Sequence, residues 1–99
     1  MKKKWILASF AVLAMSSHAS DDAVIAKYNT SCAVCHVAGV AGAPVTGDAE
    51  AWAPRLDKGM NTLVASVKNG LNAMPPGGMC HTCSDDDLRA LIEHMSVAQ

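Results

Sequence analysis

Long apolar runs, excess basic charge and aromatic side chains are all scarce in this chain of 99 residues. The apolar stretch at residues 5–15 is far shorter than the roughly 20 residues that a membrane-spanning helix needs. Eight basic residues stand against nine acidic ones with no basic stripe, which argues against a nucleic-acid partner. No segment alternates apolar and polar residues as a half-buried strand does. These absences argue against a transmembrane anchor, a nucleic-acid binder and a sheet-based fold.

The first 19 residues have the layout of a secretory signal peptide. Lysines at positions 2–4 precede the apolar stretch, and the small residues Ser17 and Ala19 occupy positions −3 and −1 of a cleavage site. We expect cleavage after Ala19 and export to the bacterial periplasm. No cysteine follows the cut to carry a lipid, so no stable membrane insertion is expected of the mature chain, residues 20–99.

The mature chain is small and acidic. It keeps five basic and nine acidic residues, a formal charge of −4. A chain of this size forms one domain, and its own core is marginal without a disulfide, a metal or a cofactor. We expect a single domain that is a monomer, with a weak dimer as the alternative.

Apolar spacing and helix-capping residues predict a small all-α domain. The last helix has the clearest pattern, because Ser84 can cap it and acidic residues at 85–87 follow in its first turn. Its apolar positions follow helical spacing at Leu88, Leu91, Ile92 and Met95. Other helices are expected at 21–30, at 48–58 with an interruption near Pro54, and from an Asn61 cap to Gly70. Glycines and prolines predict loops at residues 37–47 and 73–78.

A C-x-x-C-H motif, Cys32 to His36, is the attachment signature of c-type haem. Residues three and four apart share one helix face, so Cys32, Cys35 and His36 can meet one flat ligand. The two thiols would add to the haem vinyl groups, and the His36 imidazole would bind the iron. The alternative is a chance histidine after a disulfide or half of a zinc site. Export and small size favour haem.

Met74 is the candidate for the second axial iron ligand. Pro75 and Pro76 follow it, disfavour helix at Met74 and stiffen the loop that presents its sulfur. A His/Met pair raises the reduction potential, as suits an electron carrier. The alternative is that Met74 only fills the core, as most methionines do. The weaker candidates are Met60, Met79 and Met95.

The motifs together resemble the bacterial monohaem cytochromes of the c-five type. The matching segments cover nearly the whole mature chain and lie at residues 32–36, 39–44, 52–56, 72–76 and 80–83. The resemblance implies a class I cytochrome c fold, in which three to five helices enclose one covalently attached haem. It also implies electron transfer between redox protein partners, a respiratory donor and an acceptor.

The resemblance suggests three further cofactor-binding residues. The Pro44 carbonyl would accept a hydrogen bond from the second ring nitrogen of His36, which orients the ring and raises its basicity; the alternative is a plain turn proline. Trp52 and Arg55 are candidate hydrogen-bond donors to a haem propionate. Their alternatives are simple burial for Trp52 and a solvated charge for Arg55. We expect a propionate contact from at least one of the two.

Cys80 and Cys83 form a second C-x-x-C pair. Ser84 follows it where a haem motif would have histidine, so a second haem site is not expected. The 44 residues between the two pairs exceed the 15–20 of a zinc ribbon. In an oxidising compartment a local disulfide bracing the last helix is the simplest interpretation, and the resemblance implies it too.

The function predicted from these motifs is a periplasmic one-electron carrier that is not an enzyme. A haem-based sensor or peroxidase-like protein with a labile sixth ligand is the first alternative. A haem-free thiol–disulfide or zinc protein is the second, although the βαβ pattern of a thioredoxin-like fold is missing.

Overall fold

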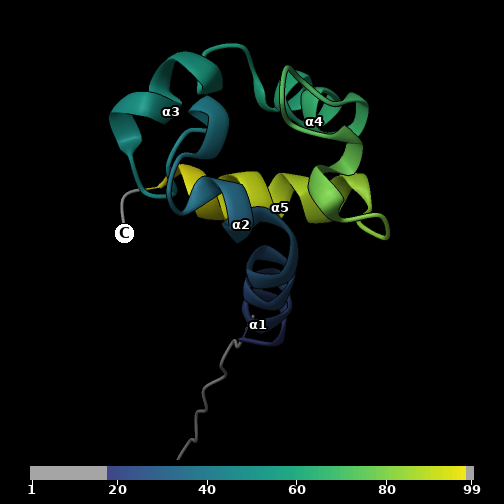
Figure 1. Ribbon diagram of the computed structural model, residues 1–99. Helices are drawn as coiled ribbons and strands as arrows, with labels where there is room; N and C mark the ends of the chain where they lie inside the picture. The colour runs from purple at the N-terminus through teal and green to yellow at the C-terminus, as the bar shows by residue number, and fades with distance from the viewer. Residues whose placement is uncertain (1–17, 98–99) are drawn as a thin grey trace, which may run out of the picture.

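The computed structural model describes residues 18–97, which form helices joined by short turns (Figure 1). Within these residues there is no strand, only an isolated bridge between Leu71 and Met74. The all-α prediction is therefore confirmed. The elements in chain order are α1 (His18–Lys27), the π-helical turn η1 (Tyr28–Cys32), α2 (Ala33–His36), the 3-10 turn η2 (Val40–Gly42), α3 (Ala49–Leu56), α4 (Met60–Asn69), the 3-10 turn η3 (Pro76–Met79) and α5 (Asp85–Ser96). None of the helices in the described part of the chain is long and apolar enough to cross a membrane. The expected leader lies almost entirely outside the described residues.

Helix α5 begins with the predicted cap. The Ser84 hydroxyl accepts a hydrogen bond from the Asp87 amide at 3.1 Å, and the Ser84 amide donates to the Asp87 carboxylate at 3.0 Å. This reciprocal capping box satisfies two amide groups that a helix start leaves without partners. The bond from the Ser84 amide is the main cause that lowers the pKa of Asp87 below its ordinary value.

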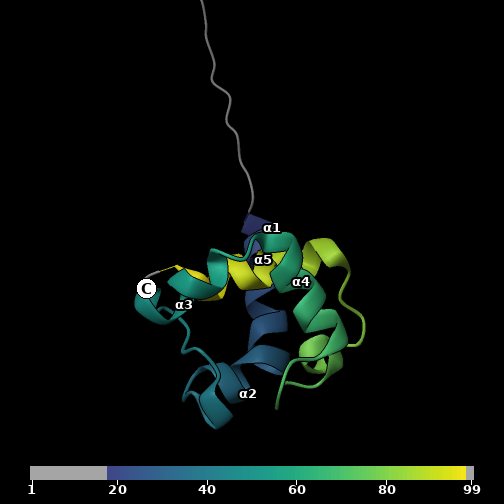
Figure 2. The same cartoon turned by 90° about the horizontal axis from the view of Figure 1, so that it is seen from above.

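Helix α5 also supplies half of the hydrophobic core. Its buried side chains contact others from η1, α3 and α4, and the complete core is Tyr28, Trp52, Leu63, Val64, Leu88, Leu91, Ile92 and Met95. In Figure 1, α1 crosses α5, whereas α3 and α4 both lie on the other side of it. Figure 2 shows α2 projecting in front of α5, between the ends of α3 and α4.

Two of the expected helix boundaries were wrong. Helix α4 begins at Met60 after Gly59, whose φ of 96° only glycine adopts readily, so Asn61 lies inside the helix and is not its cap. Helix α3 passes through Pro54 and ends at Leu56. Proline removes one hydrogen bond, to the carbonyl of the exposed Glu50, and water can replace it there.

A disulfide closes the turn between η3 and α5. Cys80 and Cys83 are bonded, with Cα atoms 5.5 Å apart. The pair therefore lies between the loop that carries Met74 and the start of α5.

Candidate functional site

The C-x-x-C-H motif lies where η1 passes directly into α2. Because this stretch is helical throughout, Cys32, Cys35 and His36 are presented from neighbouring turns. Both cysteines carry free thiols and are half-buried, whereas the His36 side chain is only 5% exposed. The sequence-predicted grouping of the three residues is therefore present in the fold.

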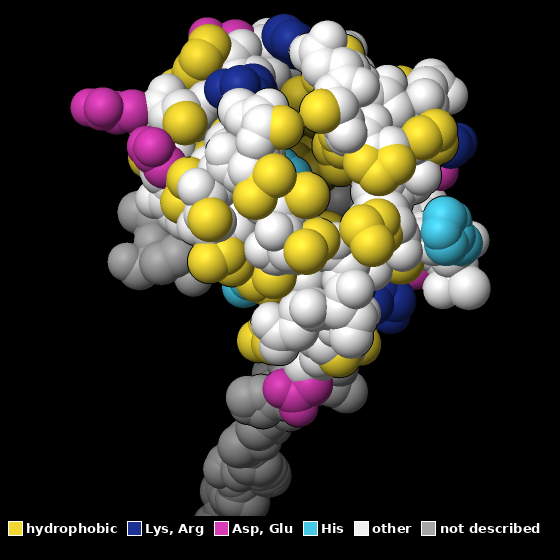
Figure 3. Space-filling view, viewed as in Figure 1, with side chains coloured by type: hydrophobic (Ala, Val, Ile, Leu, Met, Phe, Trp, Pro, Cys, Tyr) yellow, Lys and Arg dark blue, Asp and Glu magenta, His cyan; other side chains and the backbone are white. Residues whose placement is uncertain are grey.

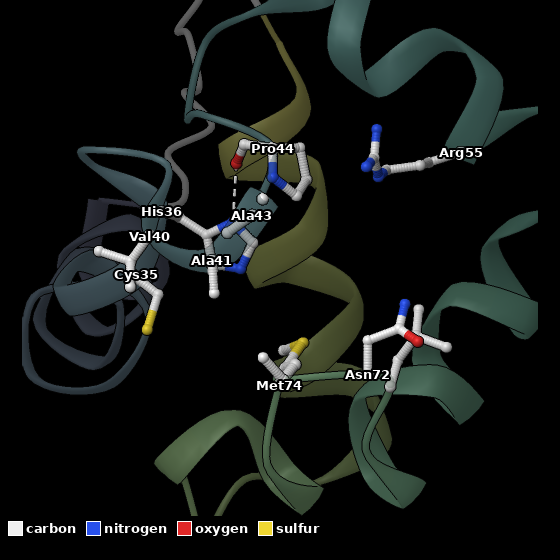
Figure 4. Close-up of a pocket in the computed structure, with 12 residues that line it drawn as sticks. Cys35, His36, Val40, Ala41, Ala43, Pro44, Arg55, Asn72 and Met74 are labelled. Atoms are coloured by element: carbon white, nitrogen blue, oxygen red, sulfur yellow. Dashed lines mark hydrogen bonds between the residues drawn. The ribbon is translucent and has the colours of Figure 1, made fainter.

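Cys35 and His36 open into a cleft of about 180 Å³ (Figure 4). Its walls come from α2, the following loop, α3 and the loop after α4, and its lining residues are Cys35, His36, Val40, Ala41, Gly42, Ala43, Pro44, Arg55, Leu71, Asn72, Ala73 and Met74. A second cavity shares Cys35, His36 and Met74 with the cleft and adds Cys32. Two thiols, an imidazole and a thioether thus border two adjoining spaces.

His36 is oriented by the segment that follows it. Its Nδ1 lies 2.7 Å from the Pro44 carbonyl oxygen, which can only accept, so Nδ1 carries the proton. The other ring nitrogen, Nε2, is left with a lone pair, and the ring borders the cleft (Figure 4). The expected contact between Pro44 and His36 is present.

Trp52 lies against His36 rather than in the cleft wall. The two rings stack with centroids 5.8 Å apart at 26°, and the indole Nε1 donates to the Val45 carbonyl at 3.0 Å. The indole N–H that we expected to donate to a propionate therefore already has a partner within the chain. Trp52 is buried, which agrees with the alternative interpretation of this residue.

Arg55 does reach the cleft from α3 (Figure 4). One of its nitrogens donates to the Ala51 carbonyl at 2.7 Å, which directs the side chain along its own helix. A guanidinium carries five N–H donors, so others remain for an acidic group in the cleft.

Met74 lies on the wall opposite His36 (Figure 4). Its amide and carbonyl exchange hydrogen bonds of 2.8 and 3.0 Å with Leu71, which folds the loop into a tight turn. Pro75 continues the chain in an extended conformation, which Pro76 favours in the residue before it. The half-buried side chain of Met74 is thereby held at the edge of the cleft.

The surface around the cleft is apolar. Yellow side chains gather around the central hollow in Figure 3, and the exposed hydrophobic residues of the cleft walls and of α2 and η3 include Val34, Val40, Leu71 and Met79. Arg55 is the one charged side chain among the residues that line the cleft.

The alternative thiol and zinc chemistries find little support in the described residues. Burial raises the pKa of the Cys32 thiol to about 11, whereas a reactive cysteine needs a lowered pKa that yields the thiolate. Residues 18–97 contain no group of three or more His, Cys, Asp or Glu side chains that can hold a metal ion.

Sequence reasoning missed parts of the cleft wall. Ala41 and Asn72 line it with φ near 54°, a left-handed conformation that non-glycine residues seldom adopt. Asparagine tolerates this conformation better than most residues, so the residue type at position 72 was a weak sign of a left-handed turn. The residue type at Ala41 gave no such sign.

Comparisons with known proteins show which family the chain belongs to. The family model described as "Cytochrome C oxidase, cbb3-type, subunit III" matches residues 19–95. Cytochrome c5 of Ectopseudomonas mendocina is 49% identical over 79 residues, which cover 78% of this chain and 87% of that protein. A mono-heme ferrocytochrome c from Shewanella putrefaciens has a similar solved structure, with 58% identity, a TM-score of 0.69, and coverage of 77% of this chain and 94% of that one. A chain in the crystal structure of an electron transfer complex of nitrite reductase with cytochrome c is 43% identical, with a TM-score of 0.68 over 75% of this chain and 90% of that one.

An all-helical domain with a C-x-x-C-H motif at a cleft lined by an imidazole and a thioether is a small cytochrome c. The chain belongs to this cytochrome c family and, within it, to the class I monohaem c-type cytochromes. Its curated relatives include the cytochromes c5 of Ectopseudomonas mendocina and Azotobacter vinelandii, so its cofactor is covalently bound haem c with iron. The donor set of the cleft fits this group, because it combines two free thiols with an imidazole and a thioether.

Proposed function

We propose that this protein is a periplasmic one-electron carrier whose haem c is attached through Cys32 and Cys35 and ligated by His36 and Met74. The observation that carries the proposal is the placement of the His36 imidazole and the Met74 thioether on opposite walls of one cleft, beside both free thiols (Figure 4). When bound, haem c supplies an iron that exchanges one electron between its ferric and ferrous states.

His36 and Met74 would hold the haem iron from two walls of the cleft. The Pro44 carbonyl orients His36, and the tight turn at Leu71 orients Met74. With both positions filled by side chains, no coordination site is open to a substrate, which is why we propose a carrier rather than an enzyme. Arg55 is the donor that we assign to a haem propionate, since the Trp52 indole N–H already bonds Val45.

Attachment at Cys32 and Cys35 rather than at the second pair rests on two observations. Only the first pair is followed by histidine, because Ser84 follows Cys83. The second pair is also bonded to itself and is absent from the lining of both cavities at His36. Replacing Cys32 and Cys35 with serine should therefore abolish haem attachment, whereas the same change at Cys80 and Cys83 should leave it intact.

The proposed location rests on residues 1–19, which we assign to a cleaved signal peptide. A disulfide between Cys80 and Cys83 persists in an oxidising compartment such as the periplasm. N-terminal sequencing of the exported protein tests the cleavage site, and a mature chain that starts at Ser20 is expected.

We assign the apolar surface around the cleft to docking of redox protein partners. Apolar side chains there leave few charges to desolvate when a partner covers the cofactor. A similar chain occurs in a solved electron transfer complex of nitrite reductase with cytochrome c, and we propose the same general kind of partner here, with the free protein a monomer.

Visible spectra of the oxidised and reduced holoprotein test the proposal. Low-spin bands and a deep-red methionine-to-iron band in the oxidised form are expected, with haem retained after denaturation. A high-spin spectrum that changes on adding carbon monoxide would favour the sensor or peroxidase alternative. Colourless folded protein would contradict the haem site altogether.

A further inference from the structure

Residues 44–47 form a strap that joins the haem-binding histidine to the rest of the domain. The backbone groups of its four residues make hydrogen bonds to three residues elsewhere in the fold, His36, Trp52 and Met95. These bonds are His36 Nδ1 to Pro44 O (2.7 Å), Trp52 Nε1 to Val45 O (3.0 Å), Thr46 N to His36 O (2.8 Å) and Gly47 N to Met95 O (2.8 Å).

The strap makes two hydrogen bonds to His36. The Pro44 carbonyl accepts from its ring, and the Thr46 amide donates to its main-chain carbonyl. Only Val45 separates these two contacts along the strap, so a displacement of Thr46 moves the Pro44 carbonyl relative to the ring. The ring's hydrogen bond therefore depends on where Thr46 is held.

Thr46 is held by a side chain of η1, the turn that precedes α2. The Tyr28 hydroxyl donates to the Thr46 hydroxyl at 2.8 Å, across 18 positions of sequence. The Tyr28 ring is 8% exposed and packs edge-on against His94 of α5, with centroids 5.0 Å apart. A buried phenol needs a hydrogen-bond partner, and Thr46 supplies it.

We propose that the hydroxyl pair of Tyr28 and Thr46 is a positioning device for His36. It fixes the Pro44 carbonyl against the ring and so contributes to the reduction potential. The inference rests on the proposed axial role of His36. A carbonyl bonded to the far nitrogen of an axial histidine raises the electron donation of the ligand and favours the ferric state. A looser strap weakens this bond, so the potential should rise.

The test compares holoprotein variants that each lose one hydroxyl with little change of shape. Tyr28→Phe and Thr46→Val should each lower the ratio of oxidised to reduced protein about threefold at fixed ambient potential, a rise of about 28 mV for one electron. The NMR resonance of the His36 Nδ1 proton in the ferrous protein should shift in both. The double variant should match the singles, because all three lack the same bond.

Two further variants separate positioning from general destabilisation. Thr46→Ser keeps the hydroxyl and should restore the potential and the Nδ1 proton resonance. Thr30→Val removes an exposed hydroxyl that bonds only carbonyls of its own helical run, Ala26 and Lys27, and should change neither. If Tyr28→Phe does not fold, the comparison of Thr46→Val with Thr46→Ser decides the question alone.

The proposal is overturned if Thr46→Val keeps the wild-type potential and Nδ1 resonance, or if the two single effects add in the double variant. Failure of the proposed function would look different, since the unmodified protein would then lack low-spin bands and the methionine-to-iron band.

Discussion

Gly78 provides the sharpest test of how Met74 is held. This glycine is buried with φ of 55°, and a Cβ added to it would lie 2.9 Å from the Met74 Cε and 3.6 Å from the Val67 Cγ1. A contact shorter than 3.0 Å cannot persist, and the flexible end of Met74 is the group that yields. Because the Met74 methyl is bonded to the sulfur, Gly78→Ala should displace the proposed ligand atom.

Gly77 offers a matched control one residue away. Its φ is 77°, also in the left-handed region, but a Cβ there would meet nothing within 4 Å. Each alanine variant should lose about 1–2 kcal/mol of unfolding free energy from the left-handed backbone. At 4–8 °C per kcal/mol for a domain of this size, the melting temperature should fall by roughly 4–16 °C in both. Only Gly78→Ala should also perturb the ligand.

The assay follows the methionine-to-iron band, the reduction potential and thermal unfolding of both holoproteins. Gly78→Ala should weaken the band and lower the potential, since loss of a thioether ligand disfavours the ferrous state. Gly77→Ala should melt earlier with its band and potential unchanged. An intact band in Gly78→Ala would refute the steric argument, and so would equal loss of the band in both variants.

Three further perturbations test the ligand role of Met74, the capping box of α5 and the disulfide. Met74→Ala should open the sixth coordination position, lower the potential and allow carbon monoxide to bind the ferrous protein; an unchanged potential in a titration would contradict ligation by Met74. The lowered pKa of Asp87 means that its stabilising effect is present above the ordinary pKa of 3.8 and is lost as pH falls through the folded-state value. The melting-temperature difference between wild type and Asp87→Asn should therefore shrink as pH falls below 3.8, and a difference independent of pH would count against the capping box. Replacing Cys80 and Cys83 with serine should lower the unfolding free energy by about 2 kcal/mol, the chain-entropy value for so short a loop, while haem stays attached. Denaturant unfolding measures the first effect, and absorbance after denaturation measures the second.

The parts of the fold that could be predicted are those specified by neighbouring residues. Helix α5 follows from the Ser84 cap and the spacing of its apolar side chains, all within one stretch of sequence. The start of α4 was misplaced because Asn61 is a good capping residue by type, whereas the observed start depends on the backbone conformation of Gly59. That conformation is a property of the turn between two packed helices, and the helix propensities of single residues do not predict it.

The site, too, has features that neighbouring residues predict and features that depend on tertiary packing. Cys32, Cys35 and His36 lie on neighbouring turns of one helical stretch, so their grouping followed from spacing alone. The partner of the Trp52 indole did not, because the path of residues 37–47 back to α3 has no periodic pattern that predicts it. The Tyr28–Thr46 bond likewise joins residues that only tertiary packing brings together.

The two proposed axial ligands are supported by different kinds of interaction, and this predicts different responses to change. His36 is held by directional hydrogen bonds to the strap, whose loosening alters electron donation while the imidazole remains in place. Met74 is held by the shape of its loop, with Gly78 packed against its methyl group. Changes in residues 44–47 should therefore shift the potential of a protein that stays low-spin, whereas changes that displace the Met74 side chain, such as Gly78→Ala, should remove the sixth ligand. A set of variants in which both segments gave the same graded shift would contradict this difference.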